Sequence, residues 1–171
     1  MAIIKLDNWL VPPTFDGRIS NGKVSFGEIS PEDLGGLRNY EVVHFFIGEE
    51  FGTNQHLLGA LEETFLASPY GIASVWKGEE GIEKVGRGII SVSHWTMIKG
   101  STLRRAGGLK AAYSNLFYML GDLQQRAGLL SNIYTCAIYN PLVKDIREPA
   151  IDTKLERTNY VEEWGDPLEE V

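Results

Sequence analysis

A glycine turn flanked by arginines is the stretch of this sequence best suited to hold an anion. Arg104-Arg105-Ala106-Gly107-Gly108 follows an apolar, β-branched run and precedes a long apolar-periodic segment. Where a strand passes into a helix N-terminus, free backbone N–H groups and the positive end of the helix dipole favour phosphate. We therefore interpret this turn as a candidate site for a cofactor pyrophosphate. The alternative is an ordinary strand-to-helix turn with two solvated arginines.

Two side chains are candidate proton carriers. His94 lies just before the turn, and an imidazole with an unperturbed pKa of about 6.5 suits a general base. Tyr139, or Tyr134 on the same run, is a candidate proton donor. The alternatives are a hydrogen-bonded histidine on a half-buried strand and core aromatics on a central strand. Cys136 lies in an apolar run without a neighbouring histidine, which argues against a catalytic thiol.

No metal site is expected from the spacing of ligand-type residues. His44 and His56 lie in different predicted elements, and the lone Cys136 excludes both a disulfide framework and a Cys-x-x-Cys motif. Glu49-Glu50 is interpreted either as a pair facing an acceptor amine or as a solvated loop pair.

Length and composition indicate one globular domain, because 171 residues with 43% apolar content are enough for a full core. No apolar run approaches the ~18 residues of a membrane span, and the first residues lack a signal-peptide pattern. We expect a cytoplasmic protein that binds no membrane. The chain has 23 acidic and 16 basic residues, without the basic stripe typical of nucleic-acid-binding domains. No nucleic-acid partner is therefore expected.

The chain is expected to have three parts. Residues 1–22 form an apolar N-terminal extension that packs on the domain or on a partner chain, because Ile3, Ile4, Leu6 and Trp9 are too apolar to remain in water. Residues 23–161 form a single α/β domain. Residues 162–171 form an acidic tail, interpreted as a solvated end or as a docking segment for a basic partner.

Periodicity and turn signals predict the elements of the domain. The predicted strands are 23–26, 71–76, 83–95, 132–139 and 154–161, with 71–76 and 83–95 paired as an antiparallel hairpin. The predicted helices begin at Ser30-Pro31, at Thr53-Asn54 and at Leu142, and the clearest helix covers 109–127. The strand before the glycine turn, the helix after it and the next strand have the length of a βαβ crossover.

This order of elements resembles the acyl-CoA N-acyltransferase (GNAT) superfamily. Its Arg-x-x-Gly signature is matched by Arg104 to Gly107, the glycine after its long helix by Gly128, and the asparagine after its next strand by Asn140. The sequence departs from the family at Leu109, where a small residue is usual, and at Arg147, where a tyrosine is frequent. It also lacks a glutamate on the strand that leads into the turn.

The resemblance implies an α/β fold with a mixed, mostly antiparallel sheet of about six strands and flanking helices. It implies transfer of an acyl group from acetyl-CoA or another acyl-CoA to a small-molecule or peptide amine. The site would use the following residues: for the cofactor Arg104, Arg105, Ala106, Gly107, Gly108 and Asn140, and for proton transfer His94 and Tyr139.

The departures from the family favour a second function of a different class. A non-catalytic structural or assembly protein, for instance a virion component, would use the same scaffold and form homo-oligomers or larger assemblies through the N-terminal extension. A weaker alternative is an acidic inhibitor of a basic enzyme.

Overall fold

The structure is a computed structural model that describes residues 2–6, 9, 15–20, 24–29, 40–47, 55–86, 88–109, 113, 115–143 and 154–165. Its strands are β1 (Ala2–Leu6), β2 (Phe15–Ser20), β3 (Val24–Ile29), β4 (Val42–Ile47), β5 (Ile72–Lys77), β6 (Gly81–Lys84), β7 (Trp95–Lys99) and β8 (Thr135–Asn140). Its helices are α1 (Gln55–Ala67), α2 (Gly100–Ala106), α3 (Leu116–Ser131) and α4 (Lys154–Trp164).

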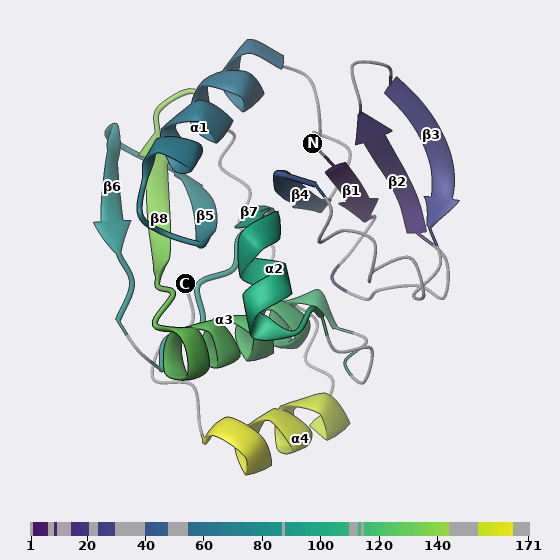
Figure 1. The fold of residues 1–171 in the computed structure, drawn as a ribbon, viewed down its shortest axis with the longest axis vertical. Coiled ribbons are helices and arrows are strands. Elements are labelled where there is room, and N and C mark those ends of the chain that lie inside the picture. Colours follow the sequence, from purple (N-terminus) through teal and green to yellow (C-terminus); the bar gives the residue numbers. More distant parts are fainter. Residues whose placement is uncertain are drawn as a thin grey trace.

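The strands form one mixed sheet in the order β3-β2-β1-β4-β7-β5-β8-β6 (Figure 1). Only the β1–β4 and β5–β8 pairs are parallel, and the other neighbours are antiparallel. This confirms the predicted α/β class with a mostly antiparallel sheet. Among the described residues the sheet has eight strands rather than about six, because β1 and β2, from the expected extension, belong to it.

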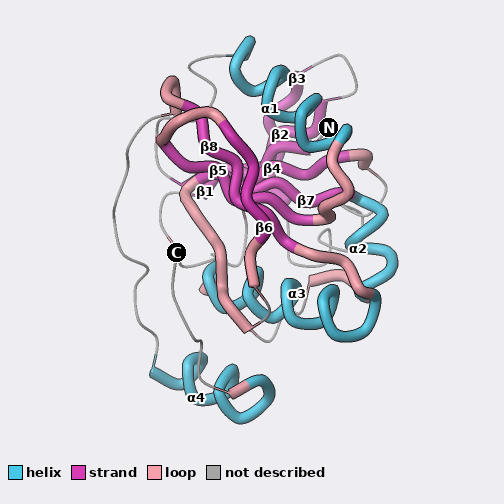
Figure 2. Tube along the Cα trace, turned by 90° about the vertical axis from the view of Figure 1, so that its left-hand side faces the viewer, coloured by secondary structure: helices cyan, strands magenta, loops and turns pink. Residues whose placement is uncertain are grey.

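Helices cover both faces of the sheet (Figure 2). On one face, α1 buries Leu58, Leu61 and Phe65 against strand residues such as Met97. On the other face, α2 and α3 pack on a second set of strand residues, and α4 packs outside α3. Successive strand residues point to opposite faces, so Ile98 lies in the α3 core although Met97 lies in the α1 core.

The apolar residues at the start of the chain lie inside this core. β1 pairs in parallel with β4 from Ala2↔Val43 to Leu6↔Ile47. Ile4 is fully buried, and the side chains of Ile3, Leu6 and Trp9 are also buried. These four side chains are therefore covered within the same chain.

The predicted hairpin of strands 71–76 and 83–95 is wrong. β8 lies between β5 and β6, and regular pairing of the second strand stops at Lys84. Gly88 has φ 82°, a left-handed conformation that interrupts an extended strand. The segment 88–94 then bonds to β5 through the side chains of Ser91 and Ser93 and to α3 through the backbone of Ser91, and β7 begins only at Trp95.

The predicted crossover around the glycine turn is also wrong. β7 and β8 are not neighbours, and the parallel partner of β8 is β5. The predicted helix 109–127 begins instead at Leu116, because Asn115 caps it by accepting a hydrogen bond from Phe117 N at 2.9 Å. α3 continues past Gly128 to Ser131, and the next residue, Asn132, takes the left-handed conformation at φ 51°.

Near its C-terminus the chain forms a helix where a strand was predicted. α4 covers Lys154–Trp164, so the expected boundary at residue 161 falls inside an element. Glu156 on α4 accepts a hydrogen bond from Asn115 N at 3.0 Å, which ties α4 to the start of α3. The predicted helices that begin at Ser30 and Leu142 lie wholly or mostly outside the described residues. Within the described part of the chain, no helix has the length and apolar character to cross a membrane.

Candidate functional site

Strands β1, β4, β5 and β8 end at the same edge of the sheet. β1 is parallel to β4, β8 is parallel to β5, and β7 is antiparallel to both β4 and β5. β1, β4, β5 and β8 therefore run in one direction, and we call the edge where they end the carboxyl edge. In open α/β sheets, ligands bind outside the carboxyl ends of the strands. A small-molecule site is expected first at this edge.

His94 lies at the carboxyl edge, because β7 runs against these strands and begins there. Its carbonyl accepts a hydrogen bond from Ile47 N at the end of β4, at 2.8 Å. Its half-buried ring meets the Trp9 ring edge-on, with centroids 5.3 Å apart. Trp9 is held in turn by Leu116 N, which donates to the Trp9 carbonyl at 2.8 Å, and its buried Nε1 has no hydrogen-bond partner among the residues that the structure describes. His94 therefore sits in an aromatic setting beside the start of α3.

Tyr139 and Asn140 end β8 at the same edge. Tyr139 is opposite Trp76 of β5, and a Cβ atom at Gly78 would lie 3.0 Å from its ring. Burial, followed by the charge of Glu83, raises the pKa of Tyr139. The phenol is therefore protonated at neutral pH. Asn140 accepts a hydrogen bond from Leu142 N through Oδ1 at 2.9 Å, so it caps the turn that follows β8.

The glycine turn closes a helix instead of opening one. Gly107 and Gly108 have φ 88° and 82°, and both of their N–H groups donate to the carbonyl of Leu103 in α2. Arg104 and Arg105 are exposed in the last turn of α2, near the negative end of its dipole. The predicted placement at a helix N-terminus is therefore wrong. Glycine after a cationic turn is a known helix C-terminus signal, and it was present in the sequence.

The structure separates the predicted site residues into two groups. β7 has five residues, so six steps of about 3.3 Å each separate His94 from Gly100 at the start of α2, a distance of roughly 20 Å. His94, Tyr139 and Asn140 lie at the carboxyl edge, whereas the turn from Arg104 to Gly108 follows α2, which begins at the other end of β7.

The two parallel strands on this side of the sheet are closely paired. β5 and β8 keep register from Ile72↔Thr135 to Lys77↔Asn140, so no slot opens between them. A polar seam formed by Ser74, Ser91, Ser93 and Gln124 covers the pair on the α3 side. Ser74 Oγ and Ser91 Oγ are 2.6 Å apart, and Ser93 Oγ accepts from Val75 N at 3.1 Å.

Gln124 of α3 completes the polar seam. Its Oε1 accepts from Ser91 N at 3.1 Å, and its Nε2 donates to Ser91 O at 2.6 Å. The amide thereby replaces the strand partner that Ser91 would have in a sheet. All four seam residues are buried, so these hydrogen bonds are needed to offset the cost of removing polar groups from water.

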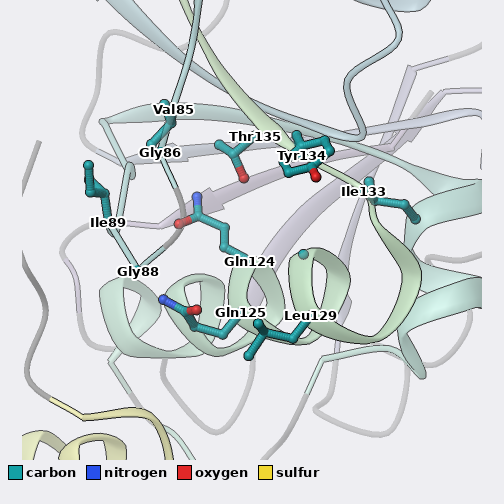
Figure 3. A pocket seen from close by; sticks show the side chains of 11 residues that line it. Val85, Gly86, Gly88, Ile89, Gln124, Gln125, Leu129, Ile133, Tyr134 and Thr135 are labelled. Carbon is teal, nitrogen blue, oxygen red and sulfur yellow. The ribbon is translucent and has the colours of Figure 1, made fainter.

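A small cavity lies between residues 85–86 and 88–89, the second half of α3 and the start of β8 (Figure 3). Its volume is about 30 Å³, and Gly88, Gln124, Gln125, Leu129 and Thr135 contribute to its wall. A water needs about 10–15 Å³ on this measure, so the space suits one or two waters. It is much too small for a nucleotide cofactor.

His44, which sequence reasoning considered only as a metal ligand, is buried on the face of the sheet that α1 covers. His44 Nδ1 accepts from Trp95 Nε1 at 3.0 Å, and His44 Nε2 lies 3.0 Å from Glu62 Oε1 on α1. Because an indole N–H only donates, His44 carries its proton on Nε2 and donates it to Glu62. Burial lowers the pKa of His44 despite the opposing effect of Glu62. The histidine thus links α1 to the sheet as a neutral side chain.

The stability of the protein is expected to fall as the pH falls below about 6.5, the ordinary pKa of histidine. The pKa of His44 is lower in the folded chain, so the unfolded chain takes up a proton first. The free energy of unfolding then decreases by at most about 1.4 kcal/mol per pH unit until the folded-state pKa is reached. Urea unfolding between pH 7.5 and 5.5 measures this slope.

His44→Gln should remove the slope, because glutamine does not titrate in this range. The matched control is His56→Gln, at the exposed histidine of α1, which should keep it. A wild-type protein and a His44→Gln variant with the same pH dependence would contradict this role of His44.

Two other kinds of site have no support among the residues that the structure describes. No group of three or more His, Cys, Asp or Glu side chains is placed to hold a metal ion in this part of the chain. Burial raises the pKa of Cys136 to about 12, so its thiol stays protonated. No protein-family model, curated protein or solved structure matches the chain.

Proposed function

We propose that this protein is a non-catalytic structural or assembly component and that it does not transfer acyl groups from CoA. The observation that carries the proposal is the position of the arginine–glycine turn at the C-terminus of α2. A pyrophosphate site of the expected kind needs the free N–H groups and the positive dipole end of a helix N-terminus, whereas this turn lies at the negative end of α2. Acyl transfer also needs room for the arm of CoA that carries the thioester to the proton carriers, and the continuous pairing of β5 with β8 leaves no slot for it.

The use of the polar groups around the turn also supports the proposal. The N–H groups of Gly107 and Gly108 are bonded to Leu103 O, so they are not directed at a ligand. The β5–β8 pair is closed and covered by the polar seam. These features favour a scaffold whose interior is fully used by its own packing.

Exposed apolar side chains support association with other molecules. Leu129 and Leu130 are adjacent at the end of α3 and are 53% and 75% exposed. Ile82 on β6 and Leu142 after β8 are also exposed. Neighbouring exposed leucines are more informative than single ones, because clustered apolar surface marks contact sites. The function proposed is therefore exerted through the surface.

Millimolar CoA or acetyl-CoA is expected to leave the melting temperature unchanged. A ligand at 100 times its Kd would stabilise the native state by about 2.7 kcal/mol, which raises the melting temperature by several degrees in a chain of this size. Differential scanning fluorimetry of the full chain measures the shift, and an assay of CoA release with a panel of amines measures turnover.

Arg104→Ala combined with Arg105→Ala tests the same point, and Arg157→Ala on α4 is the control for loss of an exposed arginine. A rise in melting temperature that the double variant abolishes and the control keeps would establish a cofactor site at the turn. Turnover of an acyl-CoA would overturn the proposed function and restore the acyltransferase.

A further inference from the structure

β6 is an exposed edge of the sheet. Each of its residues, from Gly81 to Lys84, is exposed, and in the described part of the chain its only strand partner is β8. Figure 1 shows β6 as the outermost strand on its side. An uncovered edge presents unpaired N–H and C=O groups that another strand can bind.

The hydrogen bonds between β6 and β8 determine which backbone N–H and C=O groups of β6 are available to another strand. Val85 N donates to Thr135 O of β8 at 2.9 Å. Backbone groups alternate in direction along an antiparallel strand, so those of Glu83 and Gly81 also point to β8. The N–H and C=O groups of Ile82 and Lys84 therefore point outward, away from the sheet.

We propose that β6 pairs antiparallel with β6 of a second copy about a two-fold axis at Ile82, which joins two sheets into one. The inference rests on the proposed function as an assembly component and names the partner. In this register the outward-pointing groups of Ile82 meet those of Ile82 in the second copy. Lys84 of each copy then lies near Glu80 of the other, in the bend that precedes β6.

The two neighbouring registers shifted toward Glu83 are disfavoured by charge and by hydrogen bonding. A two-fold axis at Glu83 would place this carboxylate opposite its own copy, in a pair whose Cα atoms are about 4.5 Å apart, and like charges directly opposite destabilise a sheet. A register that places Ile82 opposite Glu83 would pair outward-pointing groups with groups already bonded to β8. The register centred on Ile82 avoids both.

The side chains of this register lie on one face. Ile82 and Lys84 pair with Ile138 and Cys136 of β8 and share their α1 face. Lys84 Nζ lies 3.8 Å from the centroid of the Tyr134 ring, which holds the cation near the edge. Glu80 of a second copy approaches from the same face. Ile82, 42% exposed in the single chain, becomes covered by its counterpart.

Sedimentation equilibrium of the full chain over a range of concentrations tests the inference. A reversible dimer is expected, and Ile82→Pro should shift its midpoint to about tenfold higher concentration or beyond, because proline removes an outward N–H and blocks the ladder. The substitution keeps the β6–β8 bonds, since the N–H of Ile82 does not point to β8. Circular dichroism checks that the fold is retained.

Charge reversal supplies a test that loss of folding does not mimic. Lys84→Glu and Glu80→Lys are each expected to weaken the dimer, because like charges then face each other. A chain carrying both substitutions should dimerise like the wild type. Mixing the two single variants should also restore a dimer, since each then meets an opposite charge on the other.

A wild-type chain that stays monomeric, or a dimer indifferent to Ile82→Pro and to both charge reversals, overturns the inference. If Leu130→Glu abolishes the dimer and the β6 variants leave it intact, the interface lies at α3. This result overturns the inference about β6 but not the proposed assembly function. CoA-dependent stabilisation or turnover contradicts the proposed function whatever the oligomeric state.

Discussion

A chain that lacks residues 1–13 is expected to show no cooperative unfolding transition. The deletion removes β1, which lies between β2 and β4 in the interior of the sheet. It also removes the buried side chains Ile3, Ile4, Leu6 and Trp9. Truncation of a single buried residue of this kind costs about 2–5 kcal/mol, and whole domains have only about 5–15 kcal/mol of stability. The loss from four such residues therefore exceeds what a domain can tolerate.

Urea unfolding followed by circular dichroism measures this effect. Ile4→Ala serves as a graded version, because Ile4 is fully buried between the sheet and α3, and about 2–5 kcal/mol should be lost. Leu142→Ala is the matched control at a side chain that is 72% exposed, and it should change stability by about 0.5 kcal/mol or less. A truncated chain with the wild-type transition would contradict the position of β1.

Arg126→Met is expected to be the most damaging conservative-volume substitution in α3. Arg126 Nε donates to Asp122 Oδ2 at 2.9 Å, and both side chains are buried. Asp122 Oδ1 accepts from Trp164 Nε1 of α4 at 2.8 Å, and Arg126 Nη1 donates to Ala106 O at the end of α2 at 2.7 Å. The pair therefore connects three helices. Removal of one partner leaves a buried charge uncompensated and costs about 3–5 kcal/mol.

Asp122→Asn combined with Arg126→Met should recover much of this loss. Asparagine keeps an acceptor for Trp164 Nε1 and carries no charge, so the penalty for an unpaired buried carboxylate disappears. Double-mutant-cycle analysis of urea unfolding gives the coupling between the two residues. Equal stability of the wild type and Arg126→Met would show that the ion pair does not contribute to the fold.

The buried pair also explains why the end of α3 was misplaced from sequence. Arg126 followed by Gly128 has the pattern of a cationic last turn with a C-terminal glycine. In the structure the arginine faces inward to Asp122, four residues earlier, and the helix continues to Ser131. The spacing of Asp122 and Arg126 was visible in the sequence. Its burial was not, because burial depends on α2 and α4 packing against this face.

The prediction that the glycine turn opens a helix is wrong for a related reason. Arginine and glycine residues are compatible with two arrangements, an anion site at a helix N-terminus and the cationic last turn of a helix that ends there. Only the position of the neighbouring helix distinguishes these two arrangements. α2 begins at Gly100, before the arginines, and so the turn closes it. A helix of seven residues has too weak a periodic pattern to be recognised with confidence from sequence.

Local patterns alone were sufficient for the fold class and for several elements. α1 begins at Gln55, next to the predicted start at Thr53-Asn54, and β8 covers most of the predicted strand 132–139. These predictions succeed because apolar spacing and turn residues act within a few positions along the chain. The same reasoning identified the apolar character of residues 3–9, although not their place in the sheet.

Tertiary structure alone decided which of these elements lie together. The sequence predicted an α/β domain with candidate residues His94, Tyr139 and Asn140. It did not predict that β8 separates β5 from β6, or that His94 and the start of α2 lie at opposite ends of β7. Strand order depends on contacts between residues distant in sequence, whereas propensity and periodicity are local. The proposed function rests on that tertiary structure, because the arginine–glycine turn closes α2 and β5 is paired with β8 without a slot.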